Sequence, residues 1–155
     1  PAALLSSISA TLAGRSVSVY GRKVVVIGMM VTISGLVATI ALIWATEQWG
    51  TSEWWMVLSL SLVGGGQGSV ISPNQTLTLA HVPQAYAGSS GAVLQTGQRI
   101  GTAIGLAVIT AIVFATLHGT NADWPLSIVA GFGVILSMCL ASLGFAVADQ
   151  RSSQA

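Results

Sequence analysis

The sequence predicts an all-α protein, a polytopic bundle of transmembrane helices. Of its 155 residues, 53% are hydrophobic and only 6% are charged, whereas soluble domains carry roughly a quarter charged residues because their surface faces water. The charged residues also leave long apolar runs between them. Most of this chain is therefore expected to lie in a bilayer, and its net charge of +1 gives no indication of nucleic-acid binding.

Four apolar runs are each long enough to cross a bilayer, which takes about 20 residues of helix. They cover residues 24–44, 54–79, 90–117 and 126–147. The apolar segment 2–13 has about half that length, so we expect it to be the truncated end of a fifth helix. Together these segments predict a partial transmembrane domain over residues 1–155, belonging to a longer protein.

The two ends of the predicted helices differ in charge. The loop before residue 24 contains Arg15, Arg22 and Lys23, whereas the loop after residue 44 contains Glu47 and Glu53 and no basic residue. Basic loops stay in the cytoplasm, so we expect the first loop and the C-terminus to be cytoplasmic. Tryptophans, which prefer the headgroup layer, fall at span ends or in the outer loops: Trp44, Trp49, Trp54, Trp55 and Trp124.

The predicted helices divide into two chemical types. Those at 24–44 and 126–147 carry only small hydroxyls and Cys139, groups that can face lipid, and a lone cysteine in an apolar run is interpreted as packing. The helices at 54–79 and 90–117 carry amides and a charge that lipid cannot satisfy. We take five of these groups as candidate residues of a substrate cavity: Gln67, Asn74, Gln95, Gln98 and Arg99.

Glycines in the two polar helices recur every four residues and define predicted packing faces. They are Gly64 and Gly68 in the first helix, and Gly97, Gly101 and Gly105 in the second. Such spacing lets two helix backbones approach closely. Plainer interpretations stay open for the polar groups: the amides can act only as glue between helices, and Arg99 can extend to the cytoplasmic surface.

The loop "GRSVSVYGRKVVV", residues 14–26, resembles the signature loop of the major facilitator superfamily, GxLaDRxGRrxxL. The matching positions are Gly14, Gly21, Arg22 and Lys23. Ser18 stands where the motif has Asp and Val19 where it has its first Arg. This departure is common in the degenerate copy of the motif in the second half of such transporters.

A second stretch, residues 64–108, is similar to the penultimate helix pair of fourteen-helix drug:proton antiporters in that superfamily. There a glycine-rich helix with an SP step leads through a VP loop to a small-residue helix with a QR pair. The resemblance implies that the chain is the C-terminal part of a major facilitator fold, its last five helices. It also implies that the helices at 54–79 and 90–117 border the central cavity.

These observations favour part of a secondary active transporter, a proton-coupled exporter of drugs or metabolites working by alternating access. Its expected partners are membrane lipid, the N-terminal helices of the same transporter, a small amphipathic substrate and protons. No carboxylate lies inside a span, so the proton-coupling carboxylate is expected elsewhere in the transporter. The location expected is the plasma membrane, with no cofactor or metal site.

Two alternatives to a transporter were weighed. An intramembrane enzyme needs a nucleophile and a base or metal at one depth, but His81 and His118 flank the helix at 90–117 at opposite faces and no GxSxG motif occurs. We therefore predict that the protein is not an enzyme. A membrane scaffold without transport activity also fits the composition, and it predicts tolerance of substitutions at Arg99.

The predicted orientation can be tested by thiol labelling in intact cells. Because the basic loop is expected inside, cysteines introduced at Ser18 and Ala155 should be protected from impermeant thiol reagents, while a cysteine at Gly50 should react. Labelling in the opposite sense would overturn the orientation.

Overall fold

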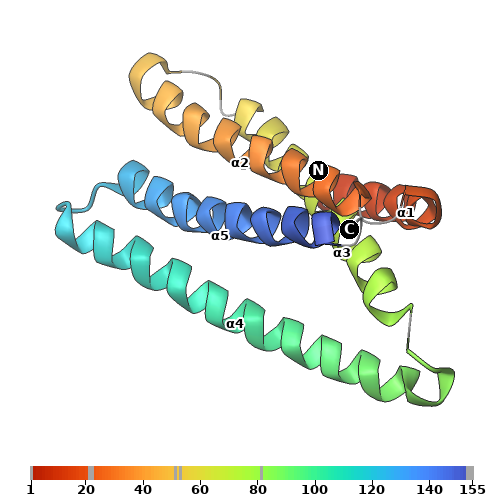
Figure 1. The fold of residues 1–155 in the computed structure, drawn as a ribbon. Helices are drawn as coiled ribbons and strands as arrows, with labels where there is room; N and C mark the ends of the chain where they lie inside the picture. Colours follow the sequence, from red (N-terminus) through yellow and green to blue (C-terminus); the bar gives the residue numbers. More distant parts are fainter. Residues whose placement is uncertain (1, 21–22, 51, 53, 81, 153–155) are drawn as a thin grey trace.

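A computed structural model describes residues 2–20, 23–50, 52, 54–80 and 82–152. The described chain consists of helices joined by short connections, which confirms the all-α prediction (Figure 1). The α-helices are α1 (Ala2–Tyr20), α2 (Lys23–Trp49), α3 (Trp54–Leu79), α4 (Ala87–Gly119) and α5 (Trp124–Ser152), and a 3₁₀ turn, η1 (Gln84–Tyr86), precedes α4.

Glycines on two faces of α3 hold this helix between α1 and α2. A Cβ at Gly64 would lie 2.5 Å from the carbonyl oxygen of Ala2 in α1. Gly66, two residues on and thus on the opposite side of the helix, meets α2 instead, where a Cβ would lie 2.6 Å from the backbone nitrogen of Thr32. Alternate glycines therefore give α3 two surfaces of close backbone approach.

A hydroxyl pair joins α2 and α3 near the end opposite the basic loop. The Thr39 hydroxyl donates to Ser59 Oγ at 2.9 Å, and Thr39 is 2% exposed. The neighbouring Leu36 is the most buried large apolar residue of α2. The single proton of the Thr39 hydroxyl is within reach of both Ser59 Oγ and the Gly35 carbonyl oxygen, and the Ser59 hydroxyl donates to the Met56 carbonyl oxygen. Both hydroxyls therefore have partners within the protein.

Helices α4 and α5 form an antiparallel hairpin. Asp123 begins α5 by accepting a hydrogen bond from the Leu126 backbone N–H at 3.0 Å, a standard capping contact. Gly131 of α5 faces Val113 and Ile109 of α4. Toward its N-terminal half α4 separates from α5 (Figure 1), and its side chains there are largely exposed.

The helix bounds differ from the predicted spans mainly at the first connection. The segment 14–20, expected to be loop, continues α1 as helix to Tyr20. It contains no proline, and the Ser16 hydroxyl is satisfied by the Leu12 carbonyl oxygen at 2.9 Å, so nothing in these residues ends the helix. Helix α3 coincides with the apolar run 54–79, whereas α2, α4 and α5 extend a few residues beyond their runs, into the expected headgroup layer.

Among the described residues, three helical segments are long and apolar enough to cross a membrane: Lys23–Trp49, Gln84–Gly119 and Trp124–Ala148. Helix α3 has 26 residues but is not one of the three. Its glycines, amides and Pro73 make it less apolar than α2. It is the helix that glycine contacts hold between α1 and α2.

The close contact at Gly66 predicts a large effect from one methyl group. We expect Gly66→Ala to destabilise the intact transporter by about 1–3 kcal/mol, because the added carbon meets backbone atoms of α2. Thermal unfolding of the purified protein measures the effect.

Gly144→Ala in α5 is the matched control, since a Cβ there has nothing within 4 Å. Alanine favours helix over glycine by about 1 kcal/mol, so this variant should be neutral or slightly stabilised. Equal stability of the two variants would contradict the packing of α3 against α2.

Candidate functional site

The amides of α3 point in two directions. Gln67 and Asn74 are seven residues apart and share one face of the helix, whereas Gln75 lies about 100° further round. The structure pairs Gln75 with α4 and places Gln67 and Asn74 in pockets formed with α2 and α5. The polar side chains of α3 therefore lie on two different surfaces of the helix.

An amide pair links the two polar helices. Gln75 Nε2 of α3 donates to Gln98 Oε1 of α4 at 3.3 Å. Few other residues of α3 lie close to α4, so this bond is the main polar connection between them in the described chain. Within a bilayer, this bond gives one donor of Gln75 and one acceptor of Gln98 a partner that lipid cannot offer.

Residues of four helices line a pocket that contains Gln67 and has a volume of about 290 Å³. Helix α4 contributes Ile109, and α5 contributes Ile135, Met138, Cys139 and Ser142. The wall is apolar apart from small hydroxyls, the thiol and the Gln67 amide. We call this space the Gln67 pocket.

The polar face of α4 points to the same side as Ile109. At 3.6 residues per turn, Gln95, Gln98, Thr102 and Ile109 fall within an arc of roughly 60°, and Arg99 lies about 40° beyond its edge. Because Ile109 lines the Gln67 pocket and Gln98 contacts α3, this face is turned toward the other helices. The side chains of Gln95, Gln98 and Arg99 are exposed.

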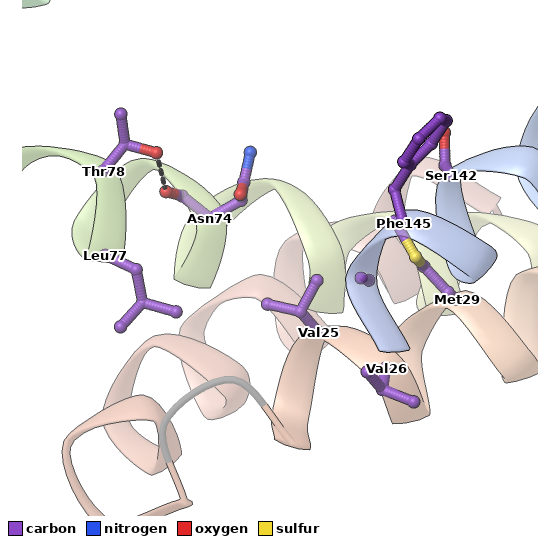
Figure 2. A pocket seen from close by; sticks show the side chains of 9 residues that line it. Val25, Val26, Met29, Asn74, Leu77, Thr78, Ser142 and Phe145 are labelled. Atoms are coloured by element: carbon purple, nitrogen blue, oxygen red, sulfur yellow. Dashed lines mark hydrogen bonds between the residues drawn. The ribbon is translucent and has the colours of Figure 1, made fainter. Parts of the chain in front are cut away.

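Asn74 lines a larger pocket, of about 510 Å³, among α2, α3 and α5. Figure 2 shows Asn74 and Thr78 on the α3 side, Val25, Val26 and Met29 on α2, and Phe145 and Ser142 on α5. The Thr78 hydroxyl donates to the Asn74 backbone carbonyl oxygen at 2.7 Å. This space, which we call the Asn74 pocket, shares Met29 and Ser142 with the Gln67 pocket, so the two adjoin.

The sequence pattern of a known family covers almost all of these elements. The Major Facilitator Superfamily matches residues 2–154. The chain belongs to this superfamily. It is therefore part of a multi-pass membrane transporter, and the superfamily consists of transporters rather than enzymes. No curated protein and no solved structure matches the chain significantly.

In this major facilitator chain, the signature-loop residues lie around the end of α1 and the start of α2. A Cβ at Gly14 would lie 3.0 Å from the Ser72 hydroxyl oxygen of α3. Lys23 is the first residue of α2 and is exposed. Gly21 and Arg22 lie outside the described residues.

The two glycine stripes of the transporter differ in their surroundings. Gly64 and Gly68 of α3 both face α1, at the backbones of Ala2 and Ser6. A Cβ at Gly97, Gly101 or Gly105 of α4 would have no described atom within 4 Å. Within the described chain, the α4 stripe therefore has no packing partner.

Gln75 is not among the candidate cavity residues taken from the sequence, although it bonds to Gln98 of α4. Gln75 lies off the face that Gln67 and Asn74 share, and the spacing within one helix does not reveal that a second helix approaches the other face. An available signal was its proximity in sequence to Pro73, since prolines bend membrane helices toward new neighbours. The described residues contain no cluster of possible metal ligands.

Proposed function

We propose that this chain is the C-terminal part of a proton-coupled exporter of amphipathic drugs or metabolites, in the fourteen-helix branch of the superfamily. It works by alternating access in the plasma membrane, with its C-terminus in the cytoplasm. The observation that carries the proposal is the amide pair between Gln75 and Gln98, which on α3 lies about one turn beyond Ile71, the last α3 residue of the Gln67 pocket.

The chemistry of this region suits an amphipathic substrate. Residues of the Gln67 pocket offer thioether and branched apolar contacts from Met29, Met138 and Ile135, together with one amide. Methionine side chains adapt to ligands of different shape, and a few polar groups in an apolar pocket orient a ligand. The pocket lining contains no charged residue, which favours recognition by shape and apolar contact.

Arg99 supplies the positive charge on the α4 polar face. A charge at the bilayer centre costs about 2.5 to 3.5 kcal/mol on insertion scales, so the intact transporter must offset that cost. We propose that Arg99 meets water, a carboxylate from the N-terminal helices, or anionic groups of the substrate. Gln95 and Gln98 on the same face extend this polar surface.

The acidic residues support a coupling group elsewhere in the transporter. Glu47 lies near the end of α2 and Asp123 caps α5, so both are at the end opposite Lys23. A proton-coupling carboxylate has to lie within the membrane. We therefore place the coupling carboxylate in the N-terminal helices.

Substitution of Arg99 tests the proposed site. The planar guanidinium forms paired hydrogen bonds that lysine cannot reproduce, so we expect Arg99→Lys and Arg99→Gln to insert normally yet lose at least about tenfold in efflux. Efflux of an amphipathic fluorescent dye from cells expressing the intact transporter measures this, with a protonophore to confirm dependence on the gradient.

Thr96→Ala is the nearby control on α4: Thr96 lies one turn before Arg99, and its hydroxyl bonds its own helix at the Ala92 carbonyl oxygen. It should transport as well as the unmodified protein. Wild-type efflux in both Arg99 variants would make Arg99 a surface anchor. The absence of gradient-dependent flux in the unmodified transporter would instead favour the scaffold alternative.

A further inference from the structure

The Asn74 pocket lies near the end of the bundle where α2 begins at Lys23 and α3 ends. Its residues come from the first two turns of α2, the last two turns of α3 and the C-terminal third of α5. Thr78 is one residue from the end of α3, while Met29 and Ser142 lie deepest along their helices. The pocket therefore extends from the headgroup level into the apolar layer.

Two of its three walls belong to helices that can cross a membrane, α2 and α5. Phe145 is 79% exposed although it lines the pocket, and Val25 and Met29 of α2 line the same pocket (Figure 2). A pocket between two such helices is reached from the lipid around them. Its volume of about 510 Å³ is within the range of roughly 300 to 1,000 Å³ typical of small-ligand sites.

The surroundings of the pocket favour a ligand with a negative head and an apolar tail. Lys23 lies two residues before Val25 and is exposed. Along the sequence, three basic residues and one acidic residue flank the pocket-lining segments of α2 and α5: Arg22, Lys23, Asp149 and Arg151. The amide of Asn74 and the hydroxyl of Thr78 add polar groups on the α3 wall.

We propose that the Asn74 pocket binds an anionic phospholipid of the inner leaflet. Lys23 and the Asn74 amide hold the headgroup, and one acyl chain lies against Val26, Met29 and Phe145. Basic pockets between membrane helices on the cytoplasmic side are suited to such headgroups. The proposal does not depend on the transported substrate, because lipid binding is measured without transport.

A tryptophan placed in the pocket can report on the lipid. The chain's own tryptophans lie at the other end of the helices, at positions 44, 49, 54, 55 and 124. The intact transporter carrying Phe145→Trp is reconstituted in vesicles with either phosphatidylglycerol or phosphatidylcholine bearing brominated acyl chains. Bromine quenches tryptophan emission on contact, and the unmodified transporter gives the background for subtraction.

We expect brominated phosphatidylglycerol to quench the Phe145→Trp signal at several-fold lower mole fraction than brominated phosphatidylcholine. Lys23→Gln in this background should reduce that preference about fivefold, and Asn74→Leu should reduce it further. Leu140→Trp is the matched control, since Leu140 is on the same helix, is 51% exposed and does not line the pocket. The control should show no headgroup preference.

Equal quenching of the Phe145→Trp signal by the two lipids would overturn the proposal, as would a preference that Lys23→Gln leaves unchanged. Native mass spectrometry of the transporter without a reporter gives an independent measurement if Phe145→Trp folds poorly. There, Lys23→Gln should lower retention of phosphatidylglycerol and leave that of phosphatidylcholine unchanged; equal retention of phosphatidylglycerol with and without Lys23→Gln would also count against the site.

Discussion

An amide inside a bilayer must find its hydrogen bonds within the protein, and the arrangement of α3 and α4 depends on this constraint. Lipid offers no donor or acceptor, and Gln75 Nε2 finds an acceptor in Gln98 Oε1 of the neighbouring helix. The same reasoning explains why Thr39 and Ser59 pair between α2 and α3. Polar contacts therefore join the helices at two separate points of the bundle.

The glycines of α3 determine which helices can pack closely against each of its faces. On α3, Gly64 and Gly68 admit α1 while Gly66 admits α2 on the other side, which leaves a third side for the amides. Helix α4 is held mainly by α5, through the contact at Gly131, and separates from it toward Gln98 and Arg99 (Figure 1). Within the described chain, the side chains of this polar half of α4 are largely exposed.

Much of this arrangement follows from the sequence, and the rest does not, for physical reasons. The helix count, the helix type and the polar character of residues 67–75 and 95–99 follow from composition and spacing. The end of α1 at Tyr20 could not be predicted, because a short polar segment without proline is compatible with helix or loop. The division of Gln67, Asn74 and Gln75 between two surfaces depends on which helices approach α3, information that periodicity within α3 does not contain.

Helices α3 and α4 meet through the side-chain amides of Gln75 and Gln98, and cross-linking is the most direct test of this contact. In the intact transporter carrying Cys139→Ser, the pair Gln75→Cys and Gln98→Cys is treated with a short bifunctional thiol reagent. We expect efficient cross-linking of this pair. We expect little cross-linking when Asn74→Cys replaces Gln75→Cys. Asn74 is one residue away on α3 but faces α2 and α5. Equal cross-linking of the two pairs, or none at Gln75 and Gln98, would contradict this contact.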